Sequence, residues 1–198
     1  MANLEPTTAG NHVAAKIPYR YVAWGLLPDP VSRRVHNVTE GLRAEFGGPE
    51  IMVPHVPILG SIILTEEDAV RTFRQACEVV GPIHCNVTHV TTSPFYYQCV
   101  HLFIDPDDKV VYHDLFLVMH EHDYMEFGFC TIGIMPQLSL LWGELTDEEK
   151  ERAQEQVSLL DETITSFNFT IDRLALYKCN DEDRTQHSWE KILELHLH

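Results

Sequence analysis

Two short runs with the same proline-polar pattern constrain the fold more than any other feature of the chain. Residues 53–59 read VPHVPIL and residues 135–141 read MPQLSLL, with His55 and Gln137 each directly after a proline. Apolar residues recur through both runs with the period of two that half-buried strands show. The sequence therefore predicts two equivalent strands, and with them an internal duplication of architecture.

Each of these strands is followed by a strong helix-start signal. Thr65 and Thr146 each precede a cluster of acids that ends three residues later, in Asp68 and Glu149. This spacing is that of a capping box, in which the threonine and the acid satisfy free backbone N–H groups at the helix N-terminus. A strand, a capped helix and further strands are thus expected twice along the chain.

The remaining elements complete an α+β pattern with antiparallel sheets. An earlier helix is expected to begin at Asp29 as N-cap, with Pro30 in its first turn. We expect residues 1–17 to form a flexible tail and residues 18–198 a single domain of two packed lobes. The expected strands are 19–27, 51–59, 83–92, 95–104, 134–142, 167–177 and 192–198, and the expected helices are 29–46, 65–81, 107–121 and 146–160.

Composition excludes several classes of partner. The formal net charge is −16 and the chain has no long Lys/Arg run, which argues against binding long nucleic acid. A small anionic ligand stays possible, because a cleft sets its own local potential. No apolar run is long enough to span a membrane and no signal peptide is evident, so we expect a soluble cytoplasmic protein. The five cysteines include no CxxC pair, so neither a disulfide framework nor a structural zinc site is expected.

The order and spacing of several segments resemble a known family, the plant-type cyclic phosphodiesterases of the two-histidine phosphoesterase superfamily. The resemblance covers most of residues 19–195 and implies a bilobal fold. Two antiparallel sheets would be related by a pseudo-twofold axis, with helices outside and one signature strand of each lobe along a central cleft. The segments that carry it are VAWGLLPD, VPHVPIL, FYYQCV, MPQLSLLWGELTDEEK and IDRLALYK.

The resemblance implies metal-free and cofactor-free hydrolysis of small cyclic phosphates, namely nucleoside 2′,3′-cyclic phosphates and ADP-ribose 1″,2″-cyclic phosphate. Each signature of the family reads His-x-Thr/Ser. One histidine takes a proton from water while the other donates one to the leaving oxygen, a task suited to the pKa of imidazole. The hydroxyls hold the phosphoryl oxygens as charge develops on them.

The chain departs from the family at both signatures. The first keeps His55 but has Pro57 in place of the hydroxyl, and the second keeps Ser139 but has Gln137 in place of the histidine. Proline offers no donor, and a glutamine amide does not titrate. Trp142 stands where the plant enzymes usually have a tyrosine. Trp24 aligns with a family tryptophan near the cleft mouth that could stack on a ring of the ligand, and a place in the core is an equal alternative for it.

These residues leave three hypotheses open. In the first, the cleft is repurposed for a small organic metabolite, with His55 as a single acid or base in an isomerisation, elimination or cyclisation. Pro57 and Trp142 make the cleft more apolar, which favours this hypothesis. In the second, a residual cyclic phosphodiesterase activity survives, and in the third the protein binds a ligand without catalysis. Substrate-binding positions are expected at Gln137, Ser139, Pro57, Trp142 and Trp24.

No metal site is predicted. His120-Glu121-His122-Asp123 has metal-ligand residue types, but the sequence supplies no further ligands for a closed site. A solvated loop is the simpler interpretation of this stretch.

Overall fold

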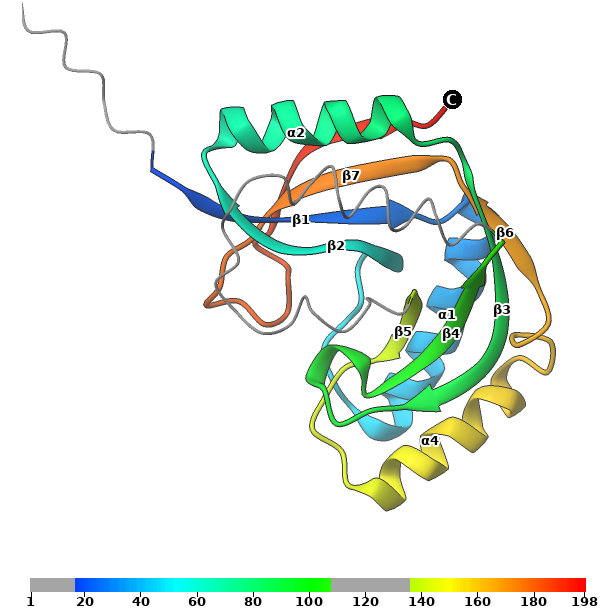
Figure 1. The fold of residues 1–198 in the computed structure, drawn as a ribbon. Helices are drawn as coiled ribbons and strands as arrows, with labels where there is room; N and C mark the ends of the chain where they lie inside the picture. The colour runs from blue at the N-terminus through cyan, green and yellow to red at the C-terminus, as the bar shows by residue number, and fades with distance from the viewer. Residues whose placement is uncertain (1–16, 108–135) are drawn as a thin grey trace, which may run out of the picture.

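The computed structural model describes residues 17–107 and 136–198 of the chain (Figure 1). The predicted helix at 107–121 lies outside these residues except for its first residue, and the tail predicted at residues 1–17 does so except for its last. The stretch 120–123 lies wholly outside them. The described residues contain two four-stranded antiparallel sheets and three α-helices. The predicted α+β class is confirmed.

Sheet A has the strand order β2-β1-β7-β8, and sheet B has the order β5-β4-β3-β6. Both sheets are antiparallel throughout. The bounds are β1 Tyr19–Leu26, β2 His55–Leu64, β7 Arg173–Lys178 and β8 Glu190–His196 for sheet A, and β3 Ile83–Thr92, β4 Val100–Pro106, β5 Gln137–Leu141 and β6 Asn168–Ile171 for sheet B.

The two predicted signature strands, β2 and β5, are the edge strands of their sheets and contact each other. The two sheets therefore meet along these edges, and Figure 1 shows β5 between β2 and β4. Because β2 is an edge strand, Pro57 is tolerated in it without a backbone N–H. A register shift against β1 follows directly after Pro57, between its partner Trp24 and Ala23.

The three helices are α1 (Asp29–Phe46), α2 (Glu66–Val79) and α4 (Asp147–Leu160). Helix α2 contacts β7 and β8 of sheet A, α4 contacts β3 and β4 of sheet B, and α1 contacts both β5 and α4. None of the described helices combines the length and apolarity that crossing a membrane requires.

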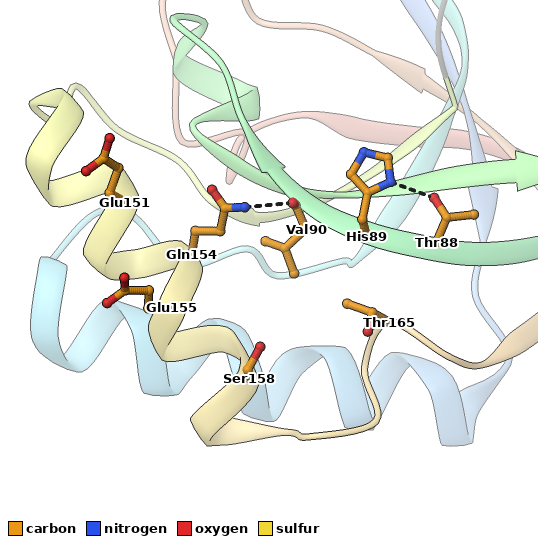
Figure 2. A pocket seen from close by; sticks show the side chains of 8 residues that line it. All are labelled: Thr88, His89, Val90, Glu151, Gln154, Glu155, Ser158 and Thr165. Carbon is orange, nitrogen blue, oxygen red and sulfur yellow. Dashed lines mark hydrogen bonds between the residues drawn. The ribbon is translucent and has the colours of Figure 1, made fainter.

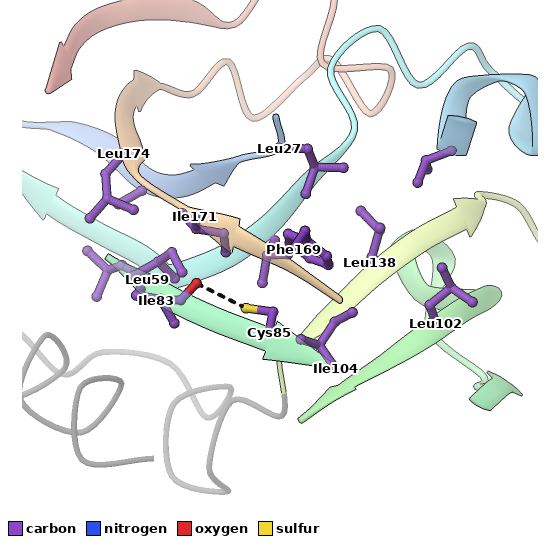
Figure 3. Close-up of a cluster of buried hydrophobic side chains, with 14 of the residues drawn as sticks. Leu27, Leu59, Ile83, Cys85, Leu102, Ile104, Leu138, Phe169, Ile171 and Leu174 are labelled. Carbon is purple, nitrogen blue, oxygen red and sulfur yellow. Dashed lines mark hydrogen bonds between the residues drawn. The ribbon is translucent and has the colours of Figure 1, made fainter. Parts of the chain in front are cut away.

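A single main core joins the two sheets. It contains side chains from the same face of neighbouring strands, among them Leu174 of β7 and Leu102 and Leu138 of sheet B. Figure 3 shows residues of both sheets in this one cluster. The core therefore covers one face of each sheet. The residues that alternate with the core residues along each strand point to the opposite face.

The two halves of the sequence do not correspond to the two sheets. Strands β3 and β4, from the first half, pair within sheet B beside the signature strand β5 of the second half. Strands β7 and β8, near the C-terminus, complete sheet A beside β1 and β2. The duplication is one of spatial arrangement, with an edge signature strand in each sheet.

The clearest differences from the expected element boundaries are at three places. The first signature strand begins at His55 and runs to Leu64, not from Ile51 to Leu59, so His55 opens the strand. Residues 96–98 form a 3₁₀ turn, η1, before β4. The predicted strand 167–177 is two strands, because the chain leaves sheet B at Ile171 and enters sheet A at Arg173.

The predicted caps are confirmed for two helices and wrong for one. Thr65 accepts a hydrogen bond from the Asp68 amide, and Thr146 forms a reciprocal capping box with Glu149. At α1 the N-cap is Pro28 without a side-chain cap, and Asp29 is the first helical residue. Its carboxylate still lies in the first turn, where the helix dipole favours negative charge.

Candidate functional site

The site residues lie on the sheet faces opposite the main core, which we call the site face. On sheet A it carries His55 and Pro57 of β2, which pair in register with Leu26 and Trp24 of β1. Residues paired directly across an antiparallel ladder point to the same side of the sheet. The register thus places His55, Pro57 and Trp24 together.

The imidazole of His55 is held by two contacts. Its Nδ1 lies 2.7 Å from the carbonyl oxygen of Val53. Because a carbonyl only accepts, Nδ1 carries the proton in this bond, and in the neutral ring Nε2 presents its lone pair. The ring also stacks on the Trp24 indole, with centroids 3.7 Å apart and planes 11° from parallel.

Burial makes His55 a neutral group. The side chain is 9% exposed. Desolvation lowers the pKa of His55 to about 4, against an opposing contribution from the Val53 hydrogen bond. At neutral pH the ring presents Nε2 as a proton acceptor, and it can donate from Nε2 only a proton that it has first taken up.

Trp24 is the centre of an aromatic wall. Its indole lies 4.0 Å from the Tyr177 ring and 5.8 Å from the Trp189 ring, measured between centroids. Trp24 and Tyr177 belong to a small buried cluster that is separate from the main core. The wall therefore packs aromatic rings beside His55, and Trp189 is its partly buried member.

On sheet B, Gln137 is the first residue of β5 and Ser139 lies two positions on. They pair in register with Phe103 and His101 of β4. Gln137 is buried, and the Ser139 hydroxyl donates to the Tyr97 carbonyl oxygen at 2.6 Å. Ser139 keeps its lone pairs for accepting, since its proton is used in this bond.

Trp142 follows directly after β5 and is buried. Its ring meets the Tyr97 ring edge-on, with centroids 5.2 Å apart and planes at 86°. The indole Nε1 is buried and finds no hydrogen-bond partner among the residues that the structure describes. Trp142 thus places a bulky indole with a buried N–H at the end of β5.

Known proteins resemble this chain in sequence and in fold. The chain is 36% identical to the cyclic phosphodiesterase of Arabidopsis thaliana over 178 residues, which cover 89% of this chain and 94% of the relative. The chain belongs to the cyclic phosphodiesterase family. No family model matches it.

Solved structures support the same fold at much lower identity. LigT of Escherichia coli, in its complex with 3′-AMP, superposes with a TM-score of 0.57 at 12% identity, covering 91% of this chain and 98% of LigT. TT0787 of Thermus thermophilus superposes with a TM-score of 0.60 at 10% identity, covering 90% of this chain and 97% of that chain. The LigT-type two-histidine fold predicted from the signatures is confirmed.

The structure places most of the predicted site residues on two adjoining strands. Of the five predicted ligand-binding positions, Pro57 and Trp24 lie beside His55 on sheet A, and Gln137 and Ser139 lie on the adjoining edge strand of sheet B. Trp142 lies at the far end of that strand. That these residues bind a ligand stays a prediction.

The sequence analysis missed His101, which pairs with Ser139 across β4 and β5. It is 7% exposed, and its Nδ1 lies 2.9 Å from the Gln98 carbonyl oxygen. Burial lowers the pKa of His101, and the nearby His89 acts in the same direction. No motif marks His101. Only the strand register reveals its place next to the second signature.

An open pocket of about 560 Å³ lies elsewhere, between β3 and α4. Figure 2 shows Gln154 donating to the Val90 carbonyl oxygen at its wall and His89 beside Thr88. Its lining contains none of the predicted site residues, but it includes His89, which pairs with Phe103 of β4 and stacks on it. Among residues 17–107 and 136–198, no three His, Cys, Asp or Glu side chains are grouped to hold a metal ion.

Proposed function

We propose that the site face binds a small organic metabolite and that His55 acts there as a single acid or base. The reaction would be of the isomerisation, elimination or cyclisation type, in which one proton is moved. The observation that carries the proposal is the state of His55, which is buried, anchored through Nδ1 and stacked on Trp24.

The protonation state of His55 favours this proposal over phosphate hydrolysis. A neutral Nε2 presents a lone pair, which repels a phosphate oxygen but accepts a proton from a C–H or O–H group. With Gln137 in the second signature, no titrating group stands at that position to protonate the leaving oxygen. One-proton chemistry needs only the histidine that remains.

The surroundings of His55 also suit an organic ligand. Trp24, Tyr177 and Trp189 provide aromatic surface, and Pro57 replaces a hydroxyl on the same face. A site of low polarity strengthens the few polar contacts that remain. Gln137 can then position a carbonyl or hydroxyl of the ligand without titrating.

A residual cyclic phosphodiesterase is the second candidate. It is supported by the 36% identity to the Arabidopsis enzyme, by the retained Ser139, and by LigT structures that hold 3′-AMP and phosphate. A ligand-binding protein without catalysis is the third. The three candidates differ in what loss of the His55 imidazole does.

Intrinsic fluorescence and mass spectrometry together test the proposal. The chain has three tryptophans, Trp24, Trp142 and Trp189, and all lie at or near the site face. Ligand binding is therefore expected to change their emission. Fractions of a metabolite extract from the source would be screened for quenching, and then for consumption of the bound compound. His55→Ala is expected to abolish consumption and to retain quenching.

His84→Ala is the matched control, because His84 is an exposed histidine on β3 that bonds Thr170. It should leave consumption unchanged. If His55→Ala consumes the compound as fast as the unmodified protein, His55 is not the catalyst. If 2′,3′-cyclic AMP is hydrolysed at a substantial rate that His55→Ala abolishes, the second candidate replaces the first.

A further inference from the structure

His101 occupies in sheet B the position that Trp24 occupies in sheet A. The edge strand β2 pairs His55 with Leu26 and Pro57 with Trp24. The edge strand β5 pairs Gln137 with Phe103 and Ser139 with His101. The registers match pair for pair, so His101 and Trp24 each lie one strand inward from the second position of their signature.

The order of strands brings both buried histidines to one surface. From His55 on β2, the next strand is β5, which contacts β2, and the strand after it is β4 with His101. Strand β4 lies about 4.8 Å from β5 in their ladder, and β2 contacts β5 where the two sheets meet, so a ligand over β5 would have His55 on one side and His101 on the other. Gln137 and Ser139 lie beneath such a ligand.

The two imidazoles are anchored in the same way. Nδ1 of His55 bonds the carbonyl oxygen of Val53, and Nδ1 of His101 bonds that of Gln98, each a few residues earlier in the chain. Both Nδ1 atoms must carry the proton, because their partners only accept. Each neutral ring then presents Nε2 as a hydrogen-bond acceptor.

We propose that His101 is a ligand-contacting, specificity-determining residue, and that His55 and His101 together select an uncharged ligand bearing two hydroxyl donors on or beside an aromatic ring. The inference rests on the proposed function, since it assigns the ligand class of the same site. Two acceptor nitrogens match two O–H donors, and the aromatic wall, whose member Trp189 is only partly buried, matches a ring. The lowered pKa values of both histidines keep these acceptors uncharged at neutral pH.

Phenolic fragments test this assignment. Catechol, resorcinol and hydroquinone present two hydroxyls at three separations on one ring, and their dimethyl ethers keep the ring but donate no hydrogen bond. The readout is the imidazole ¹⁵N resonance of each histidine, with His55→Gln and His101→Gln used for assignment. At least one diphenol is expected to shift Nε2 of both histidines, and its dimethyl ether neither.

His101→Phe gives the quantitative arm, because it keeps a flat ring and removes the acceptor. One neutral hydrogen bond contributes about 0.5–1.5 kcal/mol, so diphenol affinity is expected to fall about threefold to tenfold while ether affinity is retained. His84→Phe is the control and should leave both affinities unchanged. Should His101→Phe prove unfolded, the resonance shifts in the unmodified protein decide alone.

The outcomes separate this inference from the proposed function. A diphenol that shifts His55 but not His101 overturns the role of His101 and leaves His55 as the single acid or base. Stronger binding of inorganic phosphate than of every diphenol, with both histidines shifted, overturns the ligand class. If no fragment and no phosphate shifts either histidine, the inference is wrong. Screening the metabolite extract with the unmodified protein and with His55→Ala then still tests the proposed function separately.

Discussion

The two signature strands are both edge strands with matching registers, but they carry different parts of the His-x-Thr/Ser signature that the resemblance implies. The edge strand β2 keeps the titrating His55 and has lost its hydroxyl to Pro57. The edge strand β5 keeps the hydroxyl of Ser139 and has lost its histidine to Gln137. Neither strand has the full His-x-Thr/Ser signature that the resemblance implies, and the two departures lie on different sheets of the same fold.

The strands just inside these edges differ as well. On β1, Trp24 stacks on His55 and continues into an aromatic wall. On β4, the equivalent position is His101, which is buried and bonded to the Gln98 carbonyl. Sheet A therefore combines one base with aromatic surface, and sheet B combines polar side chains with a second imidazole. The comparison teaches that one sheet architecture accommodates quite different side chains at a few paired positions.

Restoring both signatures should give the largest effect. The double variant Pro57→Thr with Gln137→His returns the missing hydroxyl and the missing proton-transfer group. A general acid contributes about 10²–10⁴-fold, so hydrolysis of 2′,3′-cyclic AMP should rise by at least about a hundredfold. Product formation measured by liquid chromatography checks this.

Adding His55→Ala to the double variant is the control and should remove the gain. The single variants should each gain much less, because the two groups act on the same step. A double variant no faster than the unmodified protein would show that more than these two positions separates this chain from the hydrolases.

The protonation of His55 predicts a pH dependence of stability. The pKa of His55 is lowered to about 4 in the folded protein, from an ordinary value near 6.5. The contribution of neutral His55 to the free energy of unfolding is thus complete above about pH 6.5. It is lost as the pH falls through about 4, because the unfolded state binds the proton more tightly. Between pH 7 and pH 4 this loss is about 3 kcal/mol.

His55→Gln isolates this contribution, since glutamine does not titrate and all other groups are common to both proteins. Urea unfolding at several pH values should show a shallower decline for His55→Gln than for the unmodified chain. Parallel curves would mean that His55 is already exposed to water in the folded state, which would remove the main support for the proposed function.

How much of this site the sequence predicts depends on how local its signals are. His55, Gln137 and Ser139 are found because each signature is a run of a few residues within one strand. His101 is missed because its relation to Ser139 exists only through the β4–β5 register. A pattern read along the chain does not contain that pairing.

The fold shows the same limit. The α+β class and the capped helices follow from periodicity and capping residues. Residues 167–177 read as one alternating strand, yet the chain changes sheets at Asp172, whose carbonyl accepts a hydrogen bond from Leu197. The start of β2 is misplaced for a similar reason, since Ile51 to Val53 continue the apolar run without pairing to β1. Partner strands decide these boundaries.

Substitutions at two neighbouring glycines test how closely the end of α1 packs against the end of β5. Gly47 and Gly48 both have positive φ, 75° and 98°, at the end of α1. A Cβ on Gly48 would lie 2.5 Å from the carbonyl oxygen of Trp142, whereas a Cβ on Gly47 meets nothing within 4 Å. Gly47→Ala should cost about 1 kcal/mol from its backbone conformation alone.

Gly48→Ala should cost about 1–3 kcal/mol more, because the backbone at Trp142 must move. Denaturant unfolding measures both variants, and Gly47→Ala is the matched control. The perturbation should reach Trp142 but leave the stack of Trp24 on His55 intact, which tryptophan fluorescence and the His55 resonance report. Equal costs for the two variants would contradict the close contact.

The helix caps give the smallest effect and test how far the duplication extends. Thr65 follows β2 and Thr146 follows β5, and each accepts a hydrogen bond from the amide three residues on, at 3.2 Å in both cases. Loss of an N-cap side chain costs about 1 kcal/mol. Thr65→Ala and Thr146→Ala should therefore lower the free energy of unfolding by similar amounts, near that value. Ser158→Ala, at an exposed position within α4, is the control and should be neutral or slightly stabilising, since alanine is the better helix former.

The two caps differ in their carboxylate, because Glu149 accepts the Thr146 amide at 2.8 Å while Asp68 accepts the Thr65 hydroxyl at 2.7 Å. Thr65→Ala removes both of the bonds that its hydroxyl makes with Asp68, whereas Thr146→Ala leaves the bond from its own amide to Glu149. A slightly larger loss for Thr65→Ala is thus expected, and a loss for Thr146→Ala that clearly exceeds it would show that the two helix starts are stabilised by different means.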